Sequence, residues 1–108
     1  MPLEFSRVTI PVPLVPLDEL KAFLKVTDTD HDAEIASVFD AAQEEIVAYL
    51  GAGADATWTD TTAPKGVRHS IKLLTGYLYR ARGDDEQAAD PWPALRELLA
   101  RYRDPIIA

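Results

Sequence analysis

The chain of 108 residues contains no cysteine. Disulfide bridges and thiolate chemistry are therefore excluded, and a protein of this size must be stabilised by an ordinary apolar core. Long apolar runs are also missing, since no segment approaches the roughly 20 apolar residues that span a bilayer. The first residues, from Met1 to Glu4, lack the basic start and the apolar stretch of a signal peptide. These absences predict a soluble protein that is made inside a cell and has no membrane partner.

Positive charge is scarce as well. Eleven Lys and Arg residues stand against eighteen Asp and Glu residues, which gives a formal net charge of −7. An acidic surface repels phosphate, and this argues against tight binding to nucleic acid or to anionic lipid. A nucleic-acid-binding helical domain would need a helix face with an excess of basic residues, and no predicted helix has one.

Residues that carry chemistry are few and poorly placed. Asp28, Asp30 and Asp32 alternate as the first ligands of a calcium loop do. However, Ala33 occupies the position of the glycine that such a loop requires, and Phe39 occupies that of the closing glutamate. Zinc ligand spacing, nucleophile motifs and glycine-rich phosphate loops are also missing. The sequence therefore predicts no enzyme activity, no metal site and no cofactor.

Hydrophobic periodicity predicts an all-α fold, a small bundle of about four helices, in one domain. Apolar residues recur every three to four positions, so that each helix has one apolar face and one polar face, and Gln43 is assigned to a polar face. Thr29 or Asp30 is the expected cap of the second helix, and Gly51 is its expected C-terminal glycine. The expected helical ranges are 17–26, 30–50, 64–82 and 91–103.

Two extended ends flank the helices. Residues 1–16 are predicted to form an N-terminal arm, because prolines interrupt an otherwise apolar stretch and exclude a central strand. Two interpretations of this arm stay open: a floppy chain end, or a segment that docks on a neighbouring subunit. Residues 17–103 form the helical domain, and residues 104–108 form a short C-terminal tail. Trp58, in a polar connection, either closes the core beneath its loop or anchors a contact.

The order of these features resembles a known family, the head–tail connector (adaptor, or head-completion) proteins of long-tailed double-stranded DNA phages and prophages. The arm before Leu17 departs from the family, which usually begins close to its first helix. The similar features are a Leu-rich helix over Leu17–Val26, an Asp-rich cap over Asp28–Asp32, a helix closing on Tyr49-Leu50-Gly51, a loop with Trp58, a helix opening at Pro64–Arg68, and a last helix over Leu95–Arg103.

The resemblance implies a structural virion protein rather than an enzyme. It implies a homo-oligomeric ring of about twelve copies beneath the portal protein, closed by contacts between two different faces of each subunit. Such a ring extends the DNA channel, lets double-stranded DNA pass without specific binding, and carries the tail or a stopper (head-closure) protein. The protein is then found at the head–tail interface of the virion, after synthesis in the bacterial host cytoplasm.

The resemblance also implies where partners bind. The C-terminal segment usually faces the portal, and this points to Tyr102, Arg103, Ile106 and Ile107 as portal contacts. The role of the arm cannot be carried over from the family. Its apolar residues, together with the loop tryptophan, are separately expected to contact a neighbouring subunit or the tail, at Val8, Ile10, Val12 and Trp58. The alternative function is a small helical protein-interaction module, regulatory or antitoxin-like, that acts as a monomer or dimer.

Overall fold

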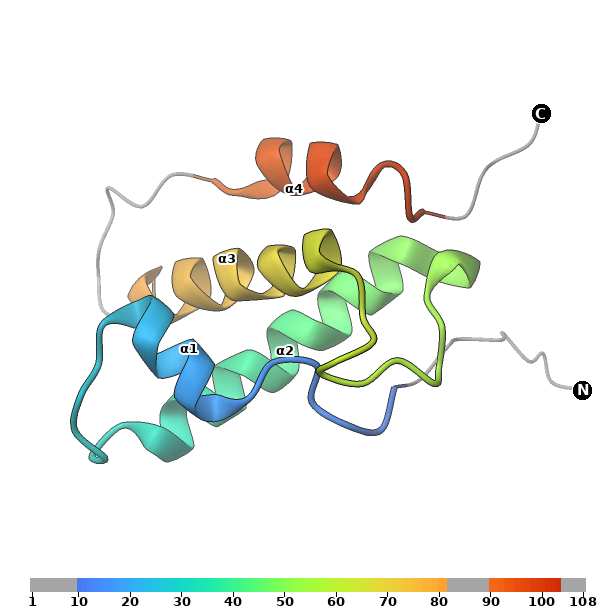
Figure 1. Ribbon diagram of the computed structural model, residues 1–108. Helices are drawn as coiled ribbons and strands as arrows, with labels where there is room; N and C mark the ends of the chain where they lie inside the picture. The colour runs from blue at the N-terminus through green and yellow to red at the C-terminus, as the bar shows by residue number, and fades with distance from the viewer. Residues whose placement is uncertain (1–9, 82–89, 104–108) are drawn as a thin grey trace, which may run out of the picture.

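The structure, a computed structural model, describes residues 10–81 and 90–103. Within these residues it contains α-helices and one short 3-10 helix, and no strand. The all-α prediction is therefore confirmed, as is the number of α-helices. The elements, drawn in Figure 1, are α1 (Leu17–Leu24), α2 (Asp32–Leu50), η1 (Gly51–Gly53), α3 (Lys65–Ala81) and α4 (Trp92–Leu99).

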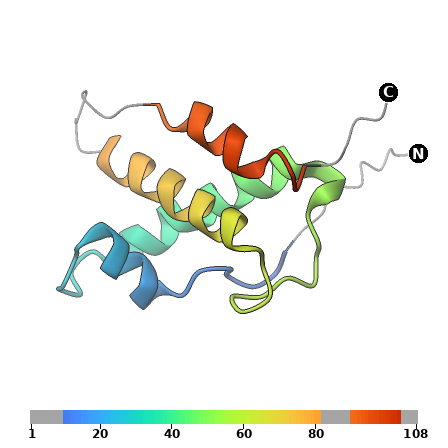
Figure 2. The same ribbon diagram turned by 45° about the horizontal axis from the view of Figure 1, so that its top comes forward.

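Helix α3 is the central element, because it contacts each of the other three α-helices. Figures 1 and 2 both show α3 between α1 and α4, while α2 crosses beneath it along most of its length. The apolar faces of all four helices meet in one core. Its helical members include Leu20 of α1, Ile35, Phe39, Ala42, Ile46 and Leu50 of α2, Val67, Ile71 and Leu74 of α3, and Leu95 and Leu99 of α4.

The ends of α1 and α2 are set by residues with positive φ. Lys25 ends α1 in the left-handed conformation (φ 63°, ψ 41°), and its N–H donates to the carbonyl of Ala22. Gly51 ends α2 with φ 60°, and its N–H donates to the carbonyl of Val47. The predicted C-terminal glycine of α2 is thus confirmed, because a residue without Cβ adopts positive φ at little cost.

The prediction for the start of α2 was wrong. The helix begins at Asp32, and neither Thr29 nor Asp30 caps it. Instead, Asp28 Oδ1 accepts a hydrogen bond from the Asp30 N–H at 3.1 Å, which closes a local turn. Lys21 Nζ lies 2.8 Å from Asp32 Oδ1 and ties α1 to the first residue of α2. The aspartates that resemble part of a calcium loop therefore shape the connection between two helices.

The last helix is shorter than expected. It ends at Leu99, where the sequence predicted helix to residue 103. The N–H groups of Tyr102 and Arg103 both donate to the Leu99 carbonyl, at 2.9 and 3.0 Å, so that a tight turn follows the helix. At its start, Asp90 Oδ1 accepts a hydrogen bond from the Trp92 N–H at 3.0 Å, as expected of a capping residue.

The extended N-terminal segment contributes to the core of its own subunit. Leu14 and Val15, which lie in the predicted arm, are 0% and 1% exposed. Figure 1 shows this segment running along the bundle before it enters α1. Any part of the arm that is free to reach a neighbour must therefore precede Leu14.

Candidate functional site

The C-terminal end of the bundle contains two of the four predicted portal contacts. Tyr102 is half-buried and packs against the core. A Cβ added at Gly66 would lie 3.0 Å from Tyr102 Cε2 and 3.3 Å from the Leu98 carbonyl oxygen. Glycine at this position of α3 therefore allows the end of α4 to approach closely, and the Tyr102 ring covers it.

Arg103 is bound to the end of α2. Its Nε donates a hydrogen bond to the Tyr49 carbonyl at 3.1 Å, and its guanidinium carbon lies 4.8 Å from the centroid of the Tyr49 ring. The last carbonyls of a helix lack intrahelical partners and attract cations, so this position suits an arginine. The Tyr49 ring in turn packs at 5.6 Å from Trp92, at the start of α4. The start of α4 and the turn after it are thus both joined to α2 through Tyr49.

These contacts fix the chain at the residue that precedes the C-terminal tail. Ile106 and Ile107 lie outside the described residues, and their role in portal contact stays a prediction. The same holds for Tyr102 and Arg103 as portal contacts, although the structure gives both a role inside the subunit. None of these intramolecular contacts was predicted, because each joins residues far apart in the sequence.

The residues expected to contact a neighbour or the tail are scattered. Val8 lies outside the described residues, Ile10 is half-buried against the core, and Val12 is 40% exposed. Trp58 is half-buried and packs against the core, which agrees with the interpretation that it closes the core beneath its loop. The contacts of these residues with partners stay predictions.

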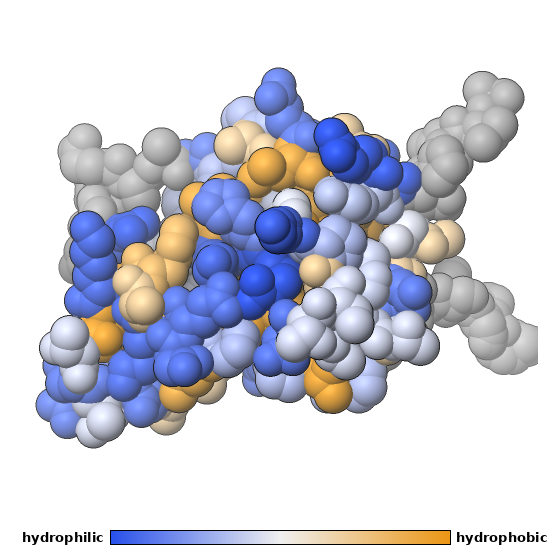
Figure 3. All heavy atoms as spheres, viewed as in Figure 1, coloured by the Kyte–Doolittle hydropathy of each residue, from blue (hydrophilic) through white to orange (hydrophobic). Residues whose placement is uncertain are grey.

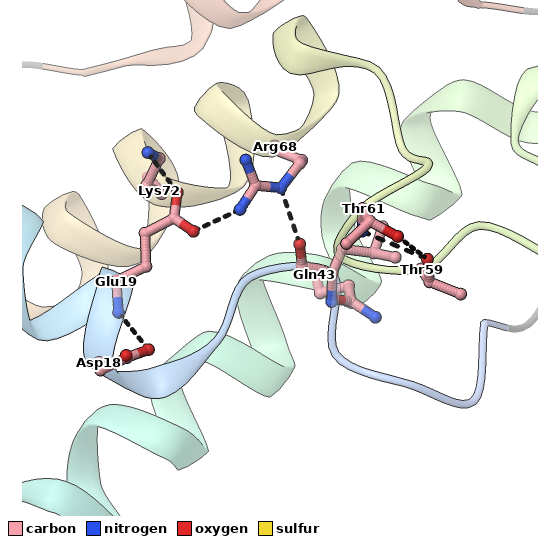
Figure 4. A network of polar contacts seen from close by, with 8 residues as sticks. Asp18, Glu19, Gln43, Thr59, Thr61, Arg68 and Lys72 are labelled. Atoms are coloured by element: carbon pink, nitrogen blue, oxygen red, sulfur yellow. Dashed lines mark hydrogen bonds and ion pairs between the residues drawn. The ribbon is translucent and has the colours of Figure 1, made fainter.

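The N-terminal segment is held by hydrogen bonds that the sequence did not reveal. Gln43 Oε1 accepts from the Leu14 N–H at 2.8 Å, and Gln43 Nε2 donates to the Val12 carbonyl at 3.0 Å. Arg68 Nε donates to the Leu14 carbonyl at 3.0 Å (Figure 4). Backbone groups that leave water need such partners, and here side chains of α2 and α3 supply them.

The assignment of Gln43 to a polar face was therefore wrong. Its side chain is 8% exposed. A signal was present in the sequence, since Gln43 lies four residues after Phe39 and three before Ile46, on the apolar side of α2. A polar side chain at such a position needs a partner in the folded protein, and here the partner is the proline-containing extended segment.

A charged cluster joins α1 to α3 beside this segment. Lys72 Nζ donates to Glu19 Oε2 at 2.9 Å, and Arg68 Nη2 donates to Glu19 Oε1 (Figure 4). The hydrogen bond from Lys72, followed by that from Arg68, holds the pKa of Glu19 below its ordinary value of 4.5. Arg68 therefore binds both the α1 carboxylate and the extended segment. The cluster fixes the direction in which the N-terminal segment enters α1.

The surface of the described residues shows little exposed apolar area. Among large hydrophobic residues, only Val12 and Leu17 are classed as exposed in this part of the chain, at 40% and 37%. On the face drawn in Figure 3, hydrophobic residues form separate spots between hydrophilic ones. The described residues thus leave less apolar surface exposed than we expect of a subunit that contacts its neighbours through apolar arms.

A groove of about 550 Å³ lies between α2, α3 and the start of α4. Its floor is apolar, whereas two glutamates of α2 stand at its edge. The lining residues are Ala41, Glu44, Glu45, Ala48, Leu74, Tyr77, Leu78 and Trp92. The described residues contain no group of three or more His, Asp or Glu side chains that could hold a metal ion. None of the described helices is long and apolar enough to cross a membrane.

Comparison with known protein families identifies the chain. The model of the phage gp6-like head-tail connector protein family matches residues 15–91, which is 77 of 108 residues. The chain belongs to this family. The resemblance noted in the sequence is confirmed, and the protein is a structural connector of a bacteriophage virion. The family is structural rather than enzymatic. Searches of curated proteins and of solved structures found no match.

The family match covers three of the four described α-helices of this connector. The match begins directly after Leu14 and ends at Pro91, so that it contains α1, α2 and α3. Helix α4 and the turn with Tyr102 and Arg103 follow the matched residues. The matched residues therefore comprise the three-helix part of the chain, and the predicted portal contacts lie outside them.

Proposed function

We propose that this connector assembles as a ring of about twelve copies beneath the portal of the phage head, with two different faces of each subunit in contact. The observation that carries the proposal is the family match over α1, α2 and α3. In this position the ring extends the DNA channel and offers a binding surface for the tail or for a stopper protein. The connector is made in the bacterial host cytoplasm before it joins the virion, and its lack of cysteine suits a reducing compartment.

The net charge of the connector supports passage of DNA without specific binding. The chain carries a formal net charge of −7, so that a channel lined by this protein repels phosphate groups. Double-stranded DNA can then move through the ring without ionic adhesion to it. We expect the affinity of the connector for short DNA duplexes to depend only weakly on salt concentration, when it is measured over a series that starts at low ionic strength.

The C-terminal tail is the part of the connector proposed to bind the portal. The contacts of Tyr102 with Gly66 and of Arg103 with Tyr49 hold the chain in place directly before the tail. Ile106 and Ile107 would then supply apolar area, at about 1.5 to 3 kcal/mol for each side chain that the portal buries. Tyr102 and Arg103 border this contact and orient it.

The experiment that tests the ring combines the full connector with portal particles from the same phage and images the mixture by electron microscopy. A ring of added density beneath the portal is expected. Portal particles without added density, together with a connector that stays a monomer or dimer at every concentration, would contradict the proposal. That outcome would favour the alternative, a small regulatory or antitoxin-like interaction module.

The tail is tested with the double variant Ile106→Ser/Ile107→Ser. Loss of both apolar side chains is expected to weaken portal binding by more than about a hundredfold. Circular dichroism should show an unchanged helix content. The matched control is Leu17→Ser, which replaces an exposed apolar residue on α1 and should leave portal binding unchanged. Equal binding by the tail variant and the control would remove the tail from the proposed interface.

A further inference from the structure

The groove between α2, α3 and α4 joins an apolar floor to an acidic edge. Leu74, Tyr77 and Leu78 of α3 form the floor, and Trp92 of α4 closes one end. Four residues of α2 form the opposite wall at helical spacing, two alanines and two glutamates, Ala41, Glu44, Glu45 and Ala48. Because the alanines are small, a second helix can approach this wall closely, and its apolar stems can reach the floor.

Within the described part of the chain, no basic residue pairs with the acidic edge. Helix α2 contains five acidic residues and no basic residue. Glu44 and Glu45 are exposed, and neither takes part in an ion pair within residues 10–81 and 90–103. An occupant with arginine or lysine side chains would therefore fit the groove, because its aliphatic stems would cover the apolar floor and its charged ends would pair with the carboxylates.

The outer face of α4 and of the turn after it has that chemistry. Arg96, Ala100 and Arg101 are exposed and point away from the buried leucines of the helix. Arg96 and Arg101 make no ion pair with any described residue, and the guanidinium carbon of Arg101 lies 6.0 Å from the centroid of the Tyr102 ring. This face thus offers two arginines separated by a small residue. It is the complement of the groove in charge and in side-chain size.

We infer that the groove of one connector subunit binds the Arg96–Arg101 face of a second copy. Arg96 and Arg101 would pair with Glu44 and Glu45, while their aliphatic stems cover the apolar floor. The inference rests on the proposed ring and names the surfaces that join its subunits. The two surfaces are different, although they adjoin on α4, where Trp92 of the groove lies one turn before Arg96. A head-to-tail contact between them would repeat from copy to copy, as ring closure requires.

The occupant is a second copy because the matching charge lies on the chain itself. DNA is excluded as an occupant, since Glu44 and Glu45 repel phosphate. The portal is proposed to bind the C-terminal tail, which leaves the groove for lateral contacts. An interface of this kind also predicts that assembly weakens as salt concentration rises, because exposed ion pairs are screened.

Disulfide crosslinking tests the contact directly, because the chain has no cysteine of its own. The double variant Ala48→Cys/Ala100→Cys, bound to portal particles and then oxidised, should give a ladder of covalent oligomers on a non-reducing gel. The single variants should give no species larger than a dimer. The matched control is Ala33→Cys/Ala100→Cys, which moves one cysteine to an exposed position at the start of α2, away from the groove, and should stay monomeric.

Charge reversal supplies an independent measurement. Glu44→Lys/Glu45→Lys and Arg96→Glu/Arg101→Glu should each lower the assembled fraction on portal particles at least about tenfold, because like charges then face each other. The combination of all four substitutions should restore assembly. Asp60→Lys, a reversal on an exposed loop residue outside the groove, is the control and should assemble normally.

The outcomes separate this inference from the proposed function. Rings that form on the portal without a crosslinked ladder, and that tolerate both reversals, overturn the interface and leave the ring intact. Absence of any ring on the portal with the unmodified chain overturns the proposed function and the interface together. A ladder of crosslinked oligomers, together with restored assembly when all four charge substitutions are combined, supports both the interface and the proposed function.

Discussion

The segment before α1 and the turn after α4 are attached to α2 and α3 in different ways. The N-terminal segment is buried: Leu14 is 0% exposed, and the side chains of Gln43 and Arg68 bind its backbone. The C-terminal turn is attached at its surface, through the Tyr102 ring over Gly66 and through Arg103 at the exposed end of α2. The fold thus encloses Leu14 and Val15 within the core, whereas it attaches Tyr102 and Arg103 at the surface.

This difference matters for assembly. A segment that fills the core cannot leave it without unfolding the subunit, whereas surface contacts tolerate rearrangement when a partner binds. The N-terminal side is therefore suited to stability, and the C-terminal side to contact with partners.

The largest expected effect is at Leu14. Leu14→Ala should lower the free energy of unfolding by about 2 to 5 kcal/mol, because a fully buried leucine leaves a cavity. Urea denaturation followed by circular dichroism measures the change. Val12→Ala, two residues earlier and 40% exposed, is the control and should change the free energy by less than about 0.5 kcal/mol. Equal effects would mean that the N-terminal segment is not part of the core.

The next effect is at Gln43. Gln43→Ala should lower the free energy of unfolding by about 1 to 3 kcal/mol, because the Leu14 N–H and the Val12 carbonyl lose their partner. Glu44→Ala is the control on the same helix, exposed and one residue later, and should change stability by less than about 0.5 kcal/mol. Hydrogen exchange at the Leu14 amide should accelerate in the first variant and not in the second.

The close approach of α4 is tested at Gly66. Gly66→Ala should destabilise by about 1 to 2 kcal/mol, because the new Cβ meets the Tyr102 ring at 3.0 Å. Gly76→Ala makes the same change in the same helix, where the nearest atom lies at 3.4 Å, and should be neutral or stabilising by up to about 1 kcal/mol. In a Tyr102→Ala background the penalty at Gly66 should shrink. If Gly66→Ala destabilises the Tyr102→Ala variant by the same amount, the contact with the Tyr102 ring is not the cause of the destabilisation.

The smallest effect concerns Glu19 and depends on pH. Its pKa lies below 4.5 in the folded protein, so its stabilising contribution is complete at pH values above 4.5 and is lost as pH falls through the folded pKa. Glu19→Gln should cost about 0.5 to 1 kcal/mol at pH 7 and progressively less below pH 4.5. Asp40→Asn, a change of an exposed carboxylate on α2, is the control and should change stability at pH 7 by less than about 0.5 kcal/mol. A pH-independent difference for Glu19→Gln would argue against the ion pairs as its cause.

The helices could be predicted from the sequence because each carries a local pattern. The repeats of apolar residues in α2 and α3 and the glycine at position 51 gave the helices and one of their ends. Such patterns depend on residues three or four positions apart, which a sequence displays directly. The fold class followed from them, and the family match then confirmed the functional class.

The remaining features depend on contacts between distant residues. The burial of Leu14 requires Gln43 and Arg68 from two other helices, and the position of Arg103 requires the free carbonyl of Tyr49. Propensity and periodicity carry no information about such pairs. The predicted portal contacts were read by analogy to the family, and their intramolecular partners became visible only in three dimensions.

The burial of Leu14 has a consequence for hybrid phages. Consider a chimera that carries only the residues of the family match, 15–91. It would lack Leu14 at one end and the buried leucines Leu95 and Leu99 at the other. The grafted segment would contain α1, α2 and α3, but cavities would remain where the buried leucines are missing. A graft of the three-helix part therefore has to include Leu14 and α4 if its core is to stay filled.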